Sequence, residues 1–156
     1  MELDQDSAVL PAYLEHANVT VRDLDEVKDM LLCALPGWRV RGEGTMDWFG
    51  QRTIRWLHVG TEHSYIALQS GGEGVAEQHP EWRSSALGTK HIGIVVPSLN
   101  EALQRLAAAG YTPDHWGGAH PFRTSAYVLA REGLQFEFVE YLSLNLSERN
   151  DYGHQP

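Results

Sequence analysis

The sequence predicts an α+β fold made of two tandem modules, each with a strand, a helix and about three more strands, which together form one cleft. The first observation is that His16–Val21 and residues 91–96 share one pattern, a histidine followed by β-branched residues, at an offset of 75 residues. The second is that the match continues into the next segment, where Leu24 corresponds to Leu99. A period this long that occurs twice indicates duplication with pseudo-twofold packing.

Composition limits the class of protein. The chain has 156 residues, 42% of them hydrophobic, which suits one compact domain or two small halves with a shared core. A net charge of -9 without blocks of Lys or Arg argues against nucleic acid and anionic membranes as partners. No apolar run is long enough to cross a membrane, no signal-peptide pattern is seen, and the single Cys33 cannot form an internal disulfide. We therefore expect a cytoplasmic protein.

The first module is expected over residues 12–70. Residues 14–21 alternate between apolar and polar side chains, which is typical of a half-buried strand. Asp23 then begins a helix with an apolar stripe, and Pro36-Gly37 ends it. Glycines separate the strands that follow, which are predicted at residues 38–42, 47–49, 53–59 and 64–69.

A connector over residues 71–88 leads to the second module, residues 89–143. Trp82 in this connector is expected either to pack on the domain or to cover the cleft. Ser98 begins the second helix and Gly110 ends it. Further strands are predicted at residues 91–96, 111–116, 123–131 and 134–142. The polar tail, residues 144–156, either frays or reaches a partner chain.

The same alternation predicts a metal site. Phe136 and Phe138 share one face of the last strand, so Glu137 points into the cleft if the phenylalanines pack on the helices. His16 and His91 start equivalent strands and are expected to face that cleft too. Two imidazoles and one carboxylate match a facial triad, which leaves coordination positions open for substrate. Such a set suits Fe, Mn, Zn or Ni, and the sequence does not choose among them.

Further catalytic candidates lie on the later strands. Because Glu137 would have limited basicity as a ligand, a separate base is expected, and His120, Arg123 and Tyr127 follow a Gly-rich loop. Arg123 and Tyr127 share a face and are candidates to bind an anionic substrate. The alternatives are a surface ion pair for Arg123 and an ordinary amphipathic strand position for Tyr127. His115 flanks the Gly-Gly loop, which is either a lid or a plain surface loop.

Paired units of this kind, carrying His91-Ile-Gly-Ile-Val-Val and Gly133-Leu-Gln-Phe-Glu-Phe-Val-Glu, resemble the glyoxalase/bleomycin resistance/extradiol dioxygenase superfamily, the vicinal oxygen chelate fold. The resemblance covers residues 12 to about 143. It implies metal ligands on the first and last strands of each module. In the first module the position that matches Glu137 is Ala67, where glyoxalase I-type isomerases are expected to have a glutamate. The implied set is then three ligands, as in thiol-transferring antibiotic resistance enzymes and extradiol dioxygenases.

The resemblance also implies a reaction type. Two neighbouring oxygens of a small-molecule substrate would chelate the metal, in a lyase, isomerase or dioxygenase reaction. A metal-free protein of bleomycin-resistance type, which sequesters an aromatic or cationic drug, is the alternative. The internal repeat makes a homodimer the expected assembly.

Overall fold

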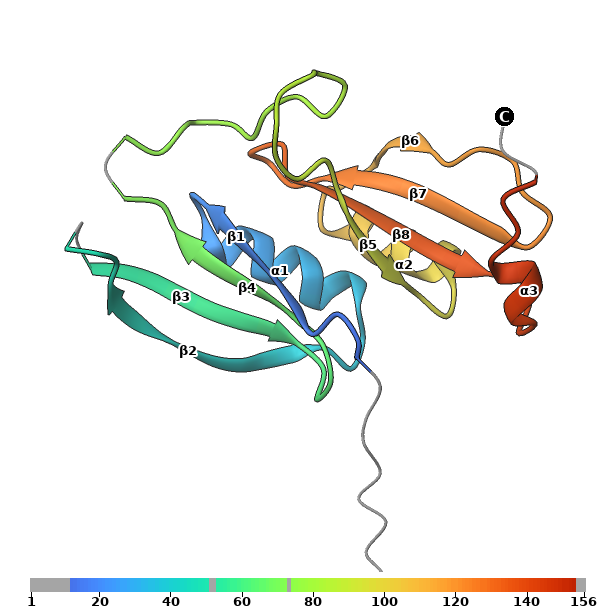
Figure 1. Cartoon of the computed structure of the whole chain (residues 1–156), viewed down its shortest axis with the longest axis horizontal. Coiled ribbons are helices and arrows are strands. Elements are labelled where there is room, and N and C mark those ends of the chain that lie inside the picture. The colour runs from blue at the N-terminus through green and yellow to red at the C-terminus, as the bar shows by residue number, and fades with distance from the viewer. Residues whose placement is uncertain (1–11, 51–52, 73, 154–156) are drawn as a thin grey trace, which may run out of the picture.

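The computed structural model describes residues 12–50, 53–72 and 74–153, and its elements form two βαβββ modules (Figure 1). The first module consists of β1 (His16–Val21), α1 (Leu24–Ala34), β2 (Arg39–Asp47), β3 (Thr53–Gly60) and β4 (Tyr65–Ser70). The second consists of β5 (Ile92–Val95), α2 (Leu99–Ala108), β6 (Pro113–Trp116), β7 (Arg123–Leu129) and β8 (Gln135–Tyr141). A short helix, α3 (Leu146–Arg149), follows within the predicted tail, whose last residues, 154–156, lie outside the described ranges.

The two sheets have the same topology, which confirms the predicted fold class. Their strand orders are β1-β4-β3-β2 and β5-β8-β7-β6, and in each sheet the first strand is parallel to the last while the other pairs are antiparallel. The register also agrees with the repeat, because Asn18 pairs with Ala67 where Gly93 pairs with Glu137. Ala67 is therefore the structural equivalent of Glu137.

Both long helices begin and end where local signals predict. The side chain of Asp23 accepts the backbone N–H of Glu26 at 3.0 Å, and that of Ser98 accepts the N–H of Glu101 at 3.3 Å. Gly110 ends α2 with a φ of +91°, a value that favours glycine over other residues. These caps replace backbone partners that the first turn of a helix lacks.

One expectation for the first module is wrong. Gly44 was expected to interrupt the chain between two short strands, whereas β2 runs unbroken through Gly42 and Gly44. A Cβ atom at Gly44 would lie only 3.1 Å from the ring of Trp56 on β3. Glycine at this position marks the close approach of an indole ring to the backbone, not a break in the strand.

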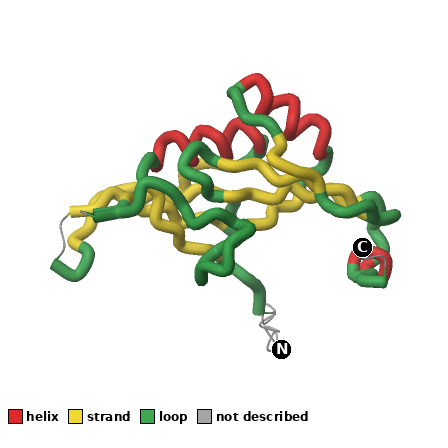
Figure 2. Tube along the Cα trace, turned by 90° about the horizontal axis from the view of Figure 1, so that it is seen from above, coloured by secondary structure: helices red, strands yellow, loops and turns green. Residues whose placement is uncertain are grey.

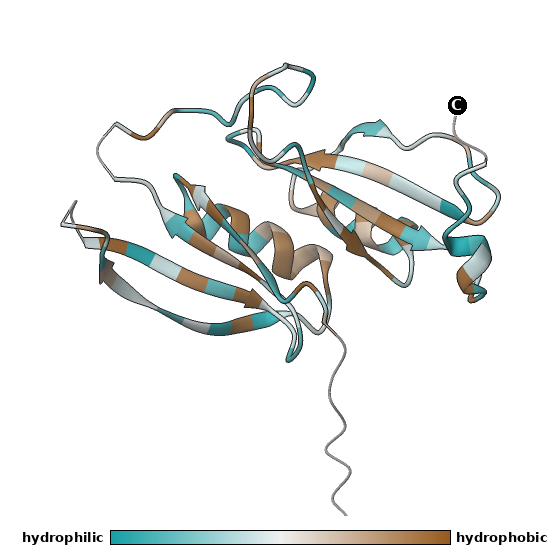
Figure 3. Ribbon diagram, in the orientation of Figure 1, coloured by the Kyte–Doolittle hydropathy of each residue, from teal (hydrophilic) through white to brown (hydrophobic). Residues whose placement is uncertain are grey.

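Apolar residues of both modules form one core on the helix side of the sheets. Figure 2 shows α1 and α2 on the same side of the strands, and the strands alternate between hydrophobic and hydrophilic segments in Figure 3. Phe136 and Phe138 are completely buried in the cluster, together with Leu31 of α1 and Leu106 of α2. The opposite face of each sheet, called the front face here, carries the polar residues.

Specific polar contacts join the modules behind the sheets. The guanidinium of Arg105 on α2 donates to the carbonyl of Ala34 at 3.0 Å. The carboxylate of Glu26 accepts the hydroxyl of Tyr111 and, at 3.2 Å, the backbone N–H of Arg131. Because Glu26 is buried, these donors from the second module replace the water that its charge would otherwise need.

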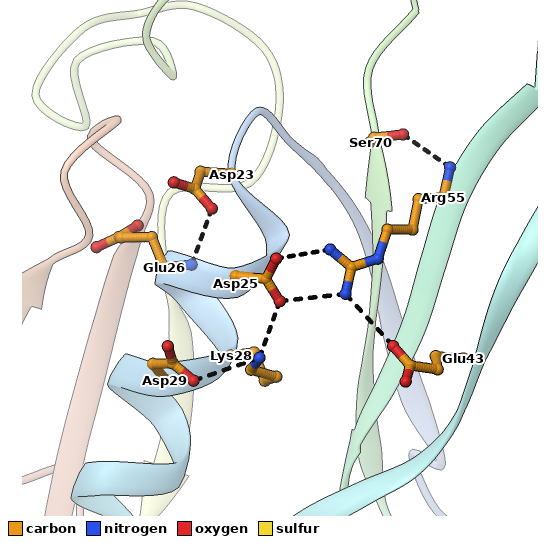
Figure 4. Close-up of polar contacts among 8 residues, drawn as sticks. All are labelled: Asp23, Asp25, Glu26, Lys28, Asp29, Glu43, Arg55 and Ser70. Atoms are coloured by element: carbon orange, nitrogen blue, oxygen red, sulfur yellow. Dashed lines mark hydrogen bonds and ion pairs between the residues drawn. The ribbon is translucent and has the colours of Figure 1, made fainter.

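Within the first module, Arg55 connects three elements (Figure 4). Its guanidinium on β3 binds both carboxylate oxygens of Asp25 on α1, at 2.6 and 3.1 Å, and reaches Glu43 on β2 at 3.3 Å. The bidentate geometry restricts α1 in its position over β3. Side-chain bonds to Arg55 and Lys28 hold the pKa of Asp25 well below its usual range.

The modules meet at two sheet edges. β1 and β5 are edge strands, and Figure 1 shows them facing one another and running in opposite directions. A cavity of about 400 Å³ between them is lined by His16, Tyr65, Trp38 and residues 92–95. Within the described residues, no helix has the length and apolar content needed to cross a membrane.

Candidate functional site

The front face of the second sheet brings together Glu137, His91 and Tyr127. Glu137 on β8 is paired with Gly93 of β5 on one side and with Tyr127 of β7 on the other. Paired residues of neighbouring strands point to the same face, so Tyr127 and Glu137 lie side by side. The Nε2 atom of His91 lies 3.4 Å from Oε2 of Glu137. A Cβ at Gly93 would lie 3.8 Å from the same oxygen, which is an ordinary van der Waals contact.

Glu137 is the better shielded member of its pair with His91. Its side chain is 19% exposed, and that of His91 is 39% exposed. Burial, followed by the hydrogen bond to Glu137, raises the pKa of Tyr127 to about 12. Tyr127 therefore stays protonated at neutral pH, and it lies beside the Glu137 carboxylate on the neighbouring strand. The arrangement is an imidazole and a phenol directed at one half-buried carboxylate.

A stack of planar groups continues from Tyr127 towards the connector. The His115 ring of β6 lies on Tyr127 with a centroid distance of 4.2 Å and an angle of 8°. Trp82 of the connector lies on His115 at 4.4 Å and 18°. The carboxylate of Asp114 meets Nδ1 of His115 at 2.7 Å. Of the two alternatives for Trp82, the structure shows packing onto the front face of the second module.

Two of the candidate catalytic residues, His120 and Arg123, are engaged elsewhere. Nε2 of His120 is 3.0 Å from the carbonyl oxygen of Asp151, and its Nδ1 accepts the N–H of Phe122. Arg123 donates to the carbonyl of Arg149 at 3.3 Å. Both residues thus join the start of β7 to the C-terminal segment. The sequence pattern did not reveal this, because it carries no information on where the tail folds back.

His16 lies on the front face of the first sheet, in an aromatic cluster of its own. Its ring stacks on Tyr65 at 4.8 Å, and Tyr65 stacks on His58 at 4.6 Å. The guanidinium of Arg41 lies 4.3 Å from the centre of the Tyr65 ring. Burial, and then the charges of His16 and Arg41, lower the pKa of His58. Strand alternation places His58 on the same face of β3 as Trp56.

The single chain unites two of the three predicted metal ligands. His16 lies beside residues 92–95 in the groove between the modules, and His91 precedes β5 at its other end. β1 and β5 run in opposite directions (Figure 1), and among the described residues His16 does not form a metal-binding cluster with His91 and Glu137. Across the described ranges, no three His, Cys, Asp or Glu side chains lie close enough to hold a metal ion. Of the three predicted ligands, His91 and Glu137 are in contact, and they offer one nitrogen and one oxygen donor.

Comparisons with known proteins place this geometry in context. No protein-family model matches the chain, and no curated protein matches it either. Among solved structures, a glyoxalase family protein from Bacillus cereus is 17% identical with a TM-score of 0.69, covering 88% of this chain and 99% of its own. A glyoxylase/bleomycin resistance protein/dioxygenase domain from Frankia sp. is 21% identical with a TM-score of 0.66, covering 85% and 99%.

A third solved structure is a mutant of the fosfomycin resistance protein FosX from Listeria monocytogenes, in complex with Mn(II) and 1S,2S-dihydroxypropylphosphonic acid. It is 17% identical with a TM-score of 0.60, and the match covers 91% of this chain and all of the other. The paired βαβββ modules and these matches over nearly whole chains agree on one architecture. The chain therefore has the vicinal oxygen chelate fold of the glyoxalase, bleomycin resistance and dioxygenase proteins.

Proposed function

We propose that the protein is a divalent-metal-dependent enzyme that binds adjacent oxygens of a small molecule. The metal would be held by His91 and Glu137 of one copy and by His16 of a second copy in a homodimer. The observation that carries the proposal is the contact of His91 with Glu137 on the front face, with Tyr127 paired beside Glu137 on the neighbouring strand. The matching position in the first module, Ala67, provides no ligand.

His16 suits the role of a ligand from another copy. Its side chain is 42% exposed on the front face of the first sheet, and among the described residues it does not form a metal-binding cluster with His91 and Glu137. A bound metal would act as a Lewis acid towards substrate oxygens. Glu137 would neutralise part of the metal charge, and the Tyr127 hydroxyl would orient the carboxylate. The half-exposed edge of His91 leaves space for substrate beside the pair.

The second candidate is metal-free binding of a flat aromatic molecule. The rings of His16, Tyr65 and His58 form a stacked surface on the first module, with Trp56 tilted at 4.9 Å from His58. Such a surface favours stacking with a planar ligand. In this case His91 and Glu137 would contribute to the front face without holding an ion.

Metal analysis separates the two functions. Protein purified without chelator would be offered Fe(II), Mn(II), Ni(II) and Zn(II) under anaerobic conditions, and the bound metal counted after desalting. We expect about one ion per chain, with the His91–Glu137 pair as its principal anchor. Glu137→Ala should abolish the retained metal, while Glu77→Gln, at an exposed connector position, should keep it.

The result that contradicts the enzyme proposal is wild-type protein that retains none of the four metals. A positive result would be followed by a screen of methylglyoxal–thiol adducts, catechols and epoxide antibiotics with the loaded protein. Turnover of one class, lost in Glu137→Ala and retained in Glu77→Gln, would assign the substrate type.

A further inference from the structure

The connector between the modules contributes side chains to the front face of the second module. It leaves the first sheet after β4, and Trp82 reaches the ring of His115 on β6. The guanidinium of Arg83 also packs on the Trp82 indole, with its central carbon 4.1 Å from the ring centre. The carboxylate of Asp114 lies 3.6 Å from Arg83 and 2.7 Å from His115. The connector is therefore held to β6 by a stacked and charged contact rather than passing freely over the surface.

The stack continues to the candidate site. His115 lies nearly parallel to Tyr127, and the edge of Tyr127 meets the His91 ring at 5.3 Å and 83°. The ring of Tyr127 thus contacts two imidazoles, and Tyr127 is paired with Glu137 on the neighbouring strand. A phenol in a half-exposed strand position would otherwise change rotamer easily, because a strand allows more than one χ1 value.

We propose that Trp82 is a positioning residue for this site: seated on His115, it holds the His115–Tyr127 stack so that Tyr127 stays against His91 and Glu137. This inference rests on the proposed function for its effect on metal binding, but its geometric part can be tested without metal. It assigns a role to the connector that leads from β4 to β5.

The contact of Trp82 depends on ring packing. Its indole Nε1 is buried and has no hydrogen-bond partner among the described residues. A buried donor without a partner contributes nothing by hydrogen bonding, so a phenylalanine at this position loses only ring area. Trp82→Phe is therefore the conservative variant. Trp82→Leu fills much of the same space but cannot stack, which makes it the disruptive variant.

The experiment compares three connector variants in the full-length protein. Trp82→Leu is expected to move the imidazole proton shifts of His115 and His91 in NMR spectra, because the ring of Tyr127 leaves its place between them. The affinity for Mn(II) alone, measured by titration, should fall about tenfold, the lower range for losing a partner of a ligand. Trp82→Phe should keep both the imidazole shifts and the Mn(II) affinity of the wild type. Leu87→Ala, at a connector residue that is 97% exposed, should change neither.

Two results would overturn the proposal. One is a folded Trp82→Leu protein in which the His91 and His115 shifts stay as in the wild type. The other is a variant whose shifts change while Mn(II) affinity does not, because the stack would then have no effect on the site. If wild-type protein takes no Mn(II), the metal-dependent function is rejected, and the imidazole shifts alone decide whether Trp82 positions Tyr127.

Discussion

At the scale of single residues, the surroundings of three glutamates decide their roles. Glu26 and Glu132 are buried where the modules meet, and each accepts a backbone N–H from the other module, at 3.2 Å from Arg131 and at 2.7 Å from Arg22. Glu137 instead faces the front, beside an imidazole and a phenol. A carboxylate bonded to backbone donors supports the fold, whereas one beside side chains with open space can bind a ligand.

The bond between Tyr111 and Glu26 gives a prediction for stability. Tyr111→Phe removes one of the two donors to a buried carboxylate, so we expect the free energy of unfolding to fall by about 1–2 kcal/mol. Burial and the neighbouring Glu26 raise the pKa of Tyr111 above its ordinary value of 10.0. A raised folded-state pKa means that this contribution is present below pH 10 and is lost as the pH rises through the folded-state pKa.

Urea denaturation at pH 7 and in steps above pH 10 measures both effects. Wild-type stability should decrease more steeply than that of Tyr111→Phe in the alkaline range. Tyr13→Phe, in which the altered ring is 58% exposed, serves as the control and should match the wild type. Equal stability of Tyr111→Phe and the wild type at pH 7 would show that the bond to Glu26 is not stabilising.

At the scale of elements, caps and alternation explain most of what the sequence predicts correctly. Asp23 and Ser98 begin helices because their side chains can accept a first-turn N–H, and this is a local property. The course of β2 through Gly44 was missed because it depends on Trp56, a residue of another strand. The sequence alone does not distinguish a glycine that ends a strand from one that makes room for an aromatic ring.

The ion pair between Asp25 on α1 and Arg55 on β3 predicts that the stability of the protein depends on pH in the acidic range. The pKa of Asp25 is lowered in the folded protein, chiefly by its bonds to Arg55. The ion pair therefore stabilises the folded state at pH values above the ordinary pKa of a carboxyl group. This contribution is lost as the pH falls below that value. Arg55→Met should therefore lower stability at pH 6 and reduce the loss between pH 5 and 3, by a modest amount because the pair is largely exposed.

Urea midpoints at pH 6, 5, 4 and 3 provide the measurement. Asp25→Asn should reproduce the flatter profile of Arg55→Met. Asp29→Asn, a change at a more exposed carboxylate on the same helix, should follow the wild type. If all three variants and the wild type share one pH profile, the pair does not act as an acid-sensitive link.

At the scale of the whole molecule, the arrangement of the two sheet edges separates the histidines that the repeat makes equivalent. β1 and β5 run in opposite directions (Figure 1), and the equivalent residues His16 and His91 do not gather with Glu137 into one cluster among the described residues. Of the predicted set, only His91 and Glu137 come into contact within one chain. His16 stays a predicted ligand, which a second copy would supply in the proposed homodimer.

Mixing two inactive variants tests this requirement. His16→Ala keeps His91 and Glu137, and Glu137→Ala keeps His16, so each variant alone should lose metal. If ligands come from two copies, a mixed dimer contains one intact site and one without either residue. After unfolding and refolding together, an equal mixture should bind about a quarter of the wild-type metal, because half of the randomly paired dimers are mixed.

Wild-type protein refolded in the same way is the control for recovery. His63→Ala mixed with Glu137→Ala tests whether any histidine change has the same effect, because His63 lies in an exposed turn between β3 and β4. Every copy in that mixture keeps His16, so metal should bind at each site that keeps Glu137 and at no others. No gain on mixing His16→Ala with Glu137→Ala would show that His16 is not a ligand shared between copies.

The sequence by itself determined the repeat, the order of strands and helices, and the face on which Glu137 lies. These depend on side-chain periodicity and helix caps, which act over a few residues. Only the tertiary structure decided that Tyr127 lies beside Glu137, that His120 and Arg123 bind the C-terminal segment, and that Trp82 stacks on His115. Each of these depends on how distant segments pack against one another, and no local pattern specifies that packing.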